Sequence, residues 1–424
     1  MTSIHKLLAL GCALGIAGCA QSGLGGSAGA LGPGASALPG LAHTGLPQGH
    51  GKRGSAVSPA IYLFQGQPDA GNPRVGLASV GSMLYGTTFS GGTNNLGAIY
   101  SMTTGGTETV MHSFSGTPDG INPDAALTNV NGTLYGTTFG QGAKAGDAGT
   151  IFSITPSGSY KVLYSFGSTA NDCLEPDSDM IYVASKNALY GTGYTGGADG
   201  DGCIFKLSLA GKKPRESVLY SFSGSSSSPP NTSGVVFFKN KLYGTTQSGG
   251  TDGHGTVYRV TLTGKESILY SFKGQPDGAA PESSLVVMGN ALYGATYQGG
   301  NLECAYAGCG TVFKVTAGGK EKVLYRFTDV ASQQDGQSPQ SALIAVGNTL
   351  YGTTPLSTTG NGLVYSVSAS GHERVVYTFL DPISGPPGYP ETPYAPLLNL
   401  NGNLYGTTVS NSGQAGAGTV FEVP

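Results

Sequence analysis

The chain has 424 residues with a formal net charge of −3, and charged residues make up 11% of it. The near-neutral charge, with no basic stretch studded with aromatic residues, excludes a nucleic-acid-binding protein. Glycine is abundant, at 72 residues, but a hydrophobic content of 38% in regularly placed runs excludes a disordered chain and is typical of a packed all-β protein with many turns.

The N-terminus has the pattern of an export signal. Lys6 supplies a positive charge, residues 7–16 are apolar, and small residues lead to Cys19. This segment is too short to remain as a membrane-spanning helix. The sequence Ile-Ala-Gly-Cys resembles the lipobox of bacterial lipoproteins, in which the cysteine becomes the lipidated first residue. We therefore expect residues 1–18 to be a lipoprotein signal peptide and Cys19 to carry the lipid. The alternative is ordinary signal cleavage with an incidental cysteine.

Residues 19–58 are rich in glycine, alanine, serine and proline and show no strand period, which predicts a flexible tether. The residues after Cys19 are not acidic. By resemblance to Gram-negative lipoproteins, this favours the outer membrane. We expect an exported protein that is held by its N-terminal lipid at the outer membrane or cell surface of a bacterium.

Residues 59–424 are organised around the phrase Leu-Tyr-Gly-Thr-Thr. It occurs seven times, once with alanine for the first threonine and once with glycine for the second. The copies lie 50 to 58 residues apart, with tyrosines at positions 85, 135, 190, 243, 293, 351 and 405. Each unit also carries a looser apolar run before this phrase. Runs of the type Gly-Thr-Ile-Phe-Ser-Ile and Val-Leu-Tyr-Ser-Phe follow it. All four are short β-branched and aromatic runs bounded by turn residues.

Four short strands per unit in seven units predict an all-β fold, a seven-bladed β-propeller. The alternative is a β-solenoid, whose coils are usually shorter and need no closure. The domain begins with a run of the fourth type at residues 61–64 and ends with a strand of the third type at residues 418–423. Pairing of these two terminal strands would complete the last blade and leave no open sheet edge. This favours the propeller.

The three recurring motifs, in this order, resemble the bacterial choice-of-anchor tandem-repeat family known as GloVer. The resemblance extends over roughly residues 60–424. The third unit departs most, because Gly193 and Cys203 stand where other units have threonine. The resemblance implies display on a cell surface through one of several kinds of anchor, and it implies no activity.

In an antiparallel blade, turns alternate between the two faces of the ring. The turns after the first and third strands are short and uniform, as tight hairpins require. The loops after the second and fourth strands are longer and irregular, and we call their side the long-loop face. Loops of this character on a rigid scaffold commonly bind ligands. Charges also segregate, with eighteen acids and three bases on the long-loop face against five acids and eleven bases on the other. Such a field can steer ligands.

Four cysteines remain after Cys19, and an even number in an exported chain predicts disulfides. Three pairings are formally available. Cys173 and Cys203 both fall on the long-loop face around the third unit, and Cys304 and Cys309 share one loop. We therefore predict the pairs 173–203 and 304–309.

Candidate ligand-facing residues come from the long loops. The aromatic candidates, which could stack on a sugar or peptide, are Tyr194, Tyr297, Tyr306, Tyr389 and Tyr394. The acidic candidates are Asp199, Asp201 and Asp252. The sequence Asp-Gly-Asp-Gly at 199–202 resembles part of a calcium loop but lacks the full ligand set, so calcium is a candidate cofactor without a complete site. The recurring aspartates before glycine are interpreted as turn residues: Asp69, Asp119, Asp277 and Asp335.

No zinc spacing, nucleophile elbow or phosphate-binding loop is present in the sequence. We assign no catalytic residue and no metal ligand, and we expect a non-catalytic binding or interaction scaffold, monomeric as a domain. Its partners would be an envelope protein, a peptide or a glycan. The alternative is a carbohydrate-active enzyme, a glycoside hydrolase or lyase that uses carboxylates on the long-loop face.

Overall fold

The fold is taken from a computed structural model of the chain. The structure describes residues 59–144, 146–223, 233–301, 304, 308–328, 335–357, 361–379, 390–411 and 417–423. The expected signal peptide, the tether and the proposed lipid site Cys19 lie outside these residues. So do two of the candidate tyrosines, Tyr306 and Tyr389.

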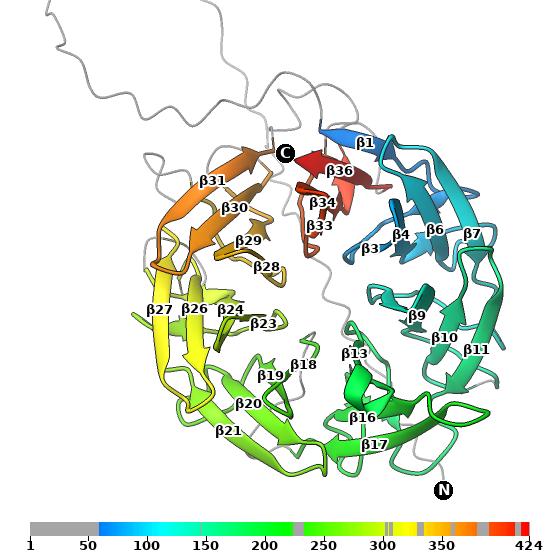
Figure 1. Ribbon diagram of the computed structural model, residues 1–424, viewed down its shortest axis with the longest axis horizontal. Coiled ribbons are helices and arrows are strands. Elements are labelled where there is room, and N and C mark those ends of the chain that lie inside the picture. Colours follow the sequence, from blue (N-terminus) through cyan, green and yellow to red (C-terminus); the bar gives the residue numbers. More distant parts are fainter. Residues whose placement is uncertain are drawn as a thin grey trace, which may run out of the picture. The chain divides into compact units, whose positions relative to one another are not determined.

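Seven four-stranded antiparallel sheets form a ring, which confirms the predicted seven-bladed propeller (Figure 1). The first strand of each blade lies nearest the axis in Figure 1, and the fourth lies on the rim. From blade one to blade seven, the first strands are β3 (Ala78–Val80), β8 (Thr128–Val130), β13 (Ile181–Val183), β18 (Val236–Phe238), β23 (Val286–Met288), β28 (Ile344–Val346) and β33 (Leu398–Leu400). The second strands are β4 (Met83–Thr88), β9 (Thr133–Thr138), β14 (Ala188–Gly193), β19 (Lys241–Thr246), β24 (Ala291–Thr296), β29 (Thr349–Thr354) and β34 (Asn403–Thr408).

The third strands, in the same order, are β6 (Ala98–Thr103), β10 (Thr150–Ile154), β16 (Cys203–Ser208), β20 (Thr256–Thr261), β26 (Thr311–Thr316), β30 (Leu363–Ser368) and β36 (Thr419–Val423). The fourth strands are β7 (Glu108–Ser113), β11 (Tyr160–Ser165), β17 (Arg215–Ser221), β21 (Glu266–Ser271), β27 (Glu321–Arg326), β31 (Glu373–Thr378) and β1 (Ala60–Leu63). In the part of the chain that the structure describes, one 3-10 turn, η1 (Ala184–Lys186), precedes β14. No helix in the described part of the chain is long and apolar enough to cross a membrane.

The first and last strands of the domain close the ring, as predicted. Strand β1 pairs antiparallel with β36, with Tyr62 opposite Val420 and Leu63 opposite Thr419. The Phe64 amide continues the ladder by donating to the Gly418 carbonyl at 3.1 Å. Since β1 becomes the fourth strand of blade seven, the first and last strands of the propeller pair with each other and no blade is left incomplete.

The glycine of the repeated phrase is required by packing inside each blade. An aromatic ring of the third strand lies over it, as Tyr100 lies over Gly86 and Phe152 over Gly136. In all seven blades a Cβ on this glycine would lie closer than 3.0 Å to that ring. The glycine therefore leaves room on the second strand for the large aromatic ring of the third strand. The repeated phrase has a structural role.

The hydrophobic core lies between blades. At every interface, the phenylalanine that follows a fourth strand meets the third-strand ring of the next blade edge-on, with centroids 5.0 to 5.6 Å apart. Each such pair contributes about 0.5–1.5 kcal/mol beyond its area burial. The first threonine of the phrase adds a polar link at five interfaces. For example, Thr87 Oγ1 donates to the Ala125 carbonyl and Thr407 Oγ1 to the Val75 carbonyl.

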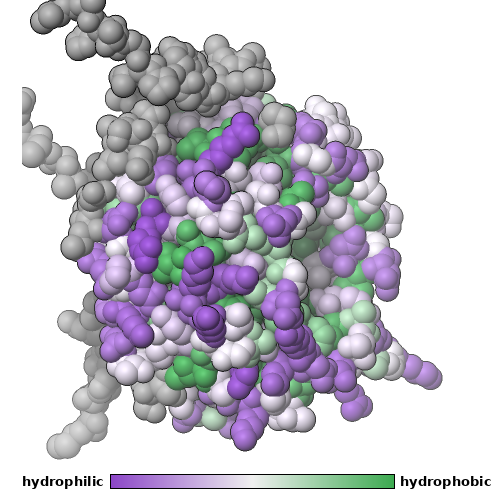
Figure 2. All heavy atoms as spheres, turned by 60° about the vertical axis from the view of Figure 1, so that its left-hand side comes forward, coloured by the Kyte–Doolittle hydropathy of each residue, from purple (hydrophilic) through white to green (hydrophobic). Residues whose placement is uncertain are grey.

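Short ladders connect the irregular loops of the long-loop face. In four blades the loop before the first strand pairs with the loop after the second. These pairs are β2 (Ala70–Gly71) with β5 (Ser90–Gly91), β12 (Cys173–Leu174) with β15 (Thr195–Gly196), β22 (Gly278–Ala279) with β25 (Gln298–Gly299), and β32 (Pro390–Glu391) with β35 (Ser410–Asn411). The side of the propeller in Figure 2 shows hydrophobic residues in small groups between hydrophilic ones.

Candidate functional site: an axial cavity on the long-loop face

A cavity of about 380 Å³ lies where the loops of the long-loop face converge on the axis. Among the described residues, six of the seven blades contribute to its wall. The lining residues that carry polar or aromatic side chains are Arg74, Asp124, Phe139, Asp177, Ser178, Asp179, Tyr194, Glu282, Ser283, Ser284, Gln340, Ser341 and Tyr394. This volume is within the range of sites that bind small molecules, roughly 300–1,000 Å³.

A repeated proline sets the geometry of the wall. It ends the loop before the first strand and packs against the glycine that opens the third strand of the preceding blade, as Pro123 packs against Gly97 and Pro281 against Gly255. The backbone carbonyl of the residue two positions after the proline accepts the hydrogen bond from the first threonine of the repeated phrase in the preceding blade. The proline contact and this hydrogen bond together fix the backbone of the segment. The residue directly after each proline, which varies between blades, lines the cavity: Arg74, Asp124, Asp177, Glu282, Gln340 and Tyr394.

Blades two and three supply three carboxylates. Asp179 Oδ1 accepts the Ala126 amide at 2.6 Å, which ties blade three to blade two. Burial raises the pKa of Asp179, and the hydrogen bond from Ala126 lowers it in part. Burial also raises the pKa of Asp124; the charge of Arg74 opposes this shift and the charge of Asp179 adds to it. These carboxyls therefore hold protons more tightly than exposed ones, unless a cation is placed beside them.

Arg74 is the only basic residue among the described residues of the lining. Its Nη1 lies 4.0 Å from Asp124 Oδ2, and its guanidinium carbon lies 3.9 Å from the centre of the Phe89 ring. The side chain of Arg74 keeps 42% of its exposure. Its charge is thus spread between one carboxylate, one aromatic face and solvent.

Glu282 occupies the opposite side of the cavity among neutral polar groups. The Gln340 Nε2 donates to Glu282 Oε2 at 3.0 Å, and the Gln247 Nε2 donates to the other carboxylate oxygen at 2.5 Å. Burial raises the pKa of Glu282, whereas these two amides lower it. Next to it, Ser284 Oγ accepts the Gly234 amide at 2.8 Å, a contact from blade five to blade four.

The structure brings some of the sequence-predicted residues to this cavity and leaves others elsewhere. Tyr194 and Tyr394 line it. Tyr297 lies close enough to Tyr394 for its charge to add to the pKa rise that burial causes there. Asp199, Asp201 and Asp252 are not among the lining residues. Within the described residues, no three His, Cys, Asp or Glu side chains gather in a way that could hold a metal ion.

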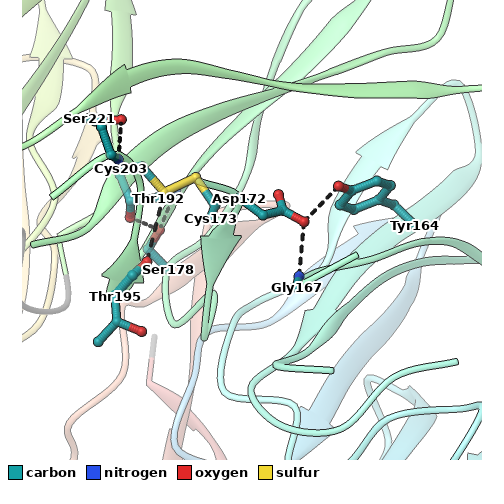
Figure 3. Close-up of a disulfide and its surroundings, with 10 residues drawn as sticks. Tyr164, Gly167, Asp172, Cys173, Ser178, Thr192, Thr195, Cys203 and Ser221 are labelled. Carbon is teal, nitrogen blue, oxygen red and sulfur yellow. Dashed lines mark hydrogen bonds between the residues drawn. A yellow bond between two sulfur atoms is a disulfide. The ribbon is translucent and has the colours of Figure 1, made fainter. Parts of the chain in front are cut away.

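Both disulfides have the predicted pairing, Cys173 with Cys203 and Cys304 with Cys309. Figure 3 shows the first of them beside Asp172. Asp172 Oδ2 accepts the Tyr164 hydroxyl at 2.7 Å and the Gly167 amide at 2.9 Å. The disulfide thus joins the loop before the first strand of blade three to the third strand of that blade.

The aspartates interpreted as turn residues have that role. Their carboxylates accept a backbone amide from the loop before them, as Asp69 accepts from Gln65 at 2.8 Å and Asp277 from Lys273 at 3.1 Å. Each carboxylate also forms a hydrogen bond with a side chain of the preceding fourth strand. The pairs are Tyr62 with Asp69, His112 with Asp119, Tyr270 with Asp277 and Tyr325 with Asp335. They are structural residues that fix the loops.

Five glutamates lie at the first or second residue of a fourth strand. They are half-buried and lie against the preceding blade: Glu108, Glu216, Glu266, Glu321 and Glu373. Burial, aided by the charge of a neighbouring turn aspartate, raises the pKa of all but Glu266 in this set to about 7. Burial also raises the pKa of Glu266. These groups are therefore interface groups, and they do not act as free surface charges.

Sequence reasoning missed most of the cavity wall. The missed residues with ionisable or amide side chains are Arg74, Asp124, Asp177, Asp179, Glu282 and Gln340. A signal for them exists in the repeat itself. The proline is nearly constant, whereas the residue after it is arginine, aspartate, glutamate, glutamine or tyrosine, with aspartate in both blade two and blade three. A position that only supports the fold would repeat one residue type.

Comparison with solved structures shows likeness of fold. A puromycin hydrolase mutant complexed with PGG matches with a TM-score of 0.50 and 13% identity, over 80% of this chain and 50% of that one, so this chain spans half the length of that enzyme. The β-propeller domain of the Trilobed protease from Pyrococcus furiosus matches with a TM-score of 0.44 and 9% identity, over 82% and 94% of the two chains. A gluconolactonase from Xanthomonas campestris matches with a TM-score of 0.38 and 12% identity, over 69% and 84%.

No curated protein sequence matches the chain. The Gloeobacter/Verrucomicrobia repeat, in contrast, matches residues 50–237 and residues 213–421, two overlapping segments that together span the propeller. This agrees with the resemblance carried by the three recurring strand motifs. The chain therefore belongs to the Gloeobacter/Verrucomicrobia repeat family.

Proposed function

We propose that this propeller is a non-catalytic binding module of the bacterial cell envelope, exported and lipid-anchored at Cys19, which binds its ligand in the axial cavity of the long-loop face. The ligand would be a glycan, a peptide or part of another envelope protein. Two disulfides support the export, because such bonds persist in oxidising compartments. The lipobox-like sequence before Cys19 supports the anchor.

One observation carries the proposal. In the six described blades that have the loop proline, the residue after it takes five different side chains, with aspartate in blades two and three, and lies in the wall of a single cavity, while the strands around it repeat almost unchanged. Convergent polar groups and aromatic rings in a concave site on a rigid scaffold are the usual features of ligand binding. If the propeller had a purely structural role, variation of the residue after the loop proline would serve no purpose.

The binding test uses the detergent-solubilised full-length protein on an array of envelope glycans and peptides. The cavity variants are Asp179→Asn, which keeps an oxygen for the Ala126 amide, and Tyr394→Ala. The matched control is Asp252→Asn, an exposed aspartate of the same face outside the cavity. We expect the cavity variants to lose at least one array signal that the control retains. Equal binding by all four proteins would contradict the proposal.

A carbohydrate-active enzyme is the second candidate, favoured by the raised pKa values of Asp124 and Asp179 in one cavity. A protonated carboxyl beside an ionised one can serve as acid and base in glycoside cleavage. The test is a screen of the purified protein for release of reducing ends from envelope polysaccharides. Turnover that disappears in Asp179→Asn and Asp124→Asn would replace the binding module by this alternative.

A further inference from the structure

The basic residues of the propeller concentrate on one part of the short-turn face, the face that carries the turns after the first and third strands. Exposed bases lie in or beside the short turns of blades three, four and five, and we call them the basic sector. They are Lys186, Lys212, Lys213, Arg215, Lys239, Lys265, Lys320 and Lys322. Blade one has no base in or beside its short turns, and blades two and six have one each, Lys161 and Arg374.

The fold does not require a base in these turns. In blade four the Thr261 amide donates to the Lys265 carbonyl at 2.9 Å, and in blade one the Thr103 amide donates to the Thr107 carbonyl at 3.0 Å. The same backbone hydrogen bond therefore closes the turn with lysine or with threonine. Both side chains are exposed. The lysine thus adds a charge to the surface without a role in the turn.

The charge of the basic sector is left open to a partner. Neither of the ion pairs formed within the described residues includes one of its bases. The acids beside it are the half-buried interface glutamates Glu216, Glu266 and Glu321, whose pKa is raised by burial. Such a sector is attracted to an anionic surface that comes within a Debye length, about 8 Å at physiological salt.

The chain enters the propeller on this same face. As the fourth strand of blade seven, β1 begins at the short-turn face, where the Pro59 carbonyl accepts the Glu422 amide of β36 at 2.9 Å. In Figure 1, β1 lies at the top of the ring and β17 and β21 lie at the bottom. The segment that follows the proposed lipid at Cys19 therefore joins the short-turn face across the ring from the basic sector.

From the charge and the point of entry together, we infer that the basic sector docks on the surface of a bilayer with anionic headgroups. This inference rests on the proposed lipid anchor and specifies how the anchored propeller is oriented. The anchor holds blade seven and headgroup phosphates hold blades three to five, so the short-turn face lies against the bilayer. Tethering raises the local concentration of the propeller at the surface, so a few bases suffice. The axial cavity on the long-loop face then points away from the membrane and stays open to its ligand.

The test uses the absence of tryptophan from the sequence. Full-length protein purified in detergent is reconstituted into vesicles that contain brominated lipid, which quenches tryptophan fluorescence on contact. Ser185→Trp places the probe at an exposed residue beside Lys186, and Asp252→Trp places it at an exposed residue of the long-loop face. In vesicles of phosphatidylethanolamine and phosphatidylglycerol we expect quenching at residue 185 and none at residue 252. The quenching should be lost in phosphatidylcholine vesicles, and also at about 1 M salt, where charges are screened.

Matched double variants in the Ser185→Trp protein isolate the charge. Lys265→Gln with Lys320→Gln removes two bases of the basic sector. Lys144→Gln with Lys273→Gln removes two exposed bases of the long-loop face. The quenched fraction across a salt titration gives the docking equilibrium constant. We expect the first pair to lower it about 25-fold, at about fivefold per base, and the second pair to leave it unchanged. The thermal unfolding of each variant checks its fold.

The outcomes separate the docking surface from the anchor. Equal quenching at residues 185 and 252, or equal quenching at residue 185 in anionic and neutral vesicles, would overturn the inference and leave the anchor intact. Flotation with anionic vesicles alone would retain the docking surface and remove the anchor, whereas flotation with neither kind of vesicle would overturn both. Retention on immobilised polygalacturonate without quenching in anionic vesicles would assign the basic sector to an anionic polysaccharide instead.

Discussion

Gly193 lies directly against the sulfur of Cys203. A Cβ at residue 193 would be 3.2 Å from Cys203 Sγ and 3.1 Å from the Cys173 Cβ. The other blades have threonine at this position, and in blades two, four, five and seven it bonds to a threonine of the third strand, as in Thr296–Thr311 at 2.8 Å and Thr138–Thr150 at 2.9 Å. Blade three therefore replaces a hydroxyl pair by a disulfide. The glycine that departs from the repeated phrase makes room for it.

Removing this disulfide should destabilise the propeller. The pair closes a segment with a sequence separation of 30, and Cys173→Ala with Cys203→Ala should cost roughly 2–4 kcal/mol. Removing Cys304–Cys309, whose separation is 5, should cost less, because the closed loop is shorter. Guanidinium unfolding midpoints of the oxidised proteins measure both effects. An unchanged midpoint for the first pair would show that the disulfide contributes nothing to stability.

The hydroxyl pair can be rebuilt in blade three. The triple variant Cys173→Gly, Gly193→Thr and Cys203→Thr copies the residues of blade five at these positions, Gly278, Thr296 and Thr311. We expect it to recover about 1 kcal/mol relative to the double alanine variant, which is the usual value of one buried hydrogen bond. Denaturation under the same conditions measures the difference. If the triple variant is less stable than the double variant, the backbone of blade three does not accommodate the threonine pair of blade five.

The half-buried glutamates between blades should make the propeller more stable in mild acid. Their pKa in the folded chain is raised to about 7, from an ordinary value of 4.5, for Glu108, Glu216, Glu321 and Glu373. A raised folded-state pKa gives stability that is complete below about pH 4.5 and is lost as the pH rises through about 7. Since solvent reaches these side chains, we expect about 1 kcal/mol per site, well below the full value of the shift.

The measurement is the melting temperature from pH 5 to pH 8. It should fall across this range, and Glu321→Gln should raise it at pH 8 and make the fall shallower. Glu175→Gln, a loop glutamate that accepts the Thr195 hydroxyl, is the control. A melting temperature that rises with pH would refute the assigned direction of these pKa shifts.

The glycine under each aromatic ring should tolerate no side chain. Gly86→Ala would push a Cβ into the Tyr100 ring, and overpacking of this kind typically costs 1–3 kcal/mol or more. Gly105→Ala is the matched control in the same blade. Its Cβ would meet only the Thr103 hydroxyl, at 3.8 Å. Chemical denaturation compares the two, and equal stability would remove the packing reason for the repeated phrase.

The lipid anchor is tested at Cys19. In Cys19→Ala the acceptor of the lipid is lost, and we expect the exported protein to leave the membrane fraction and to lose incorporation of labelled fatty acid. Fractionation of cells that express the full chain measures this, with Cys12→Ala as the control. A Cys19→Ala protein that remains in the membrane fraction would rule out a lipid at this residue as the anchor.

The blades, the closure by β1 and both disulfide pairs could be predicted because they depend on local strand patterns and on the order of strands in a repeat. The axial cavity could not, because its wall rests on single variable residues such as Asp124 and Glu282 that carry no strand pattern. Asp179 becomes enclosed only when the first strands of the blades converge. The burial of Glu321 had a readable signal, since Val323, two positions along β27 (Glu321–Arg326), lies on the same side of the strand.

The proposed function requires the ligand to bind in the axial cavity. Hydrogen–deuterium exchange of the full-length protein, with and without the strongest ligand from the array, tests it most directly. We expect protection concentrated in the segments that contain the cavity-lining residues: 74–76, 124–126, 177–179, 282–284, 340–342 and 394–396. Protection confined to the short turns or to the fourth strands on the rim would contradict it.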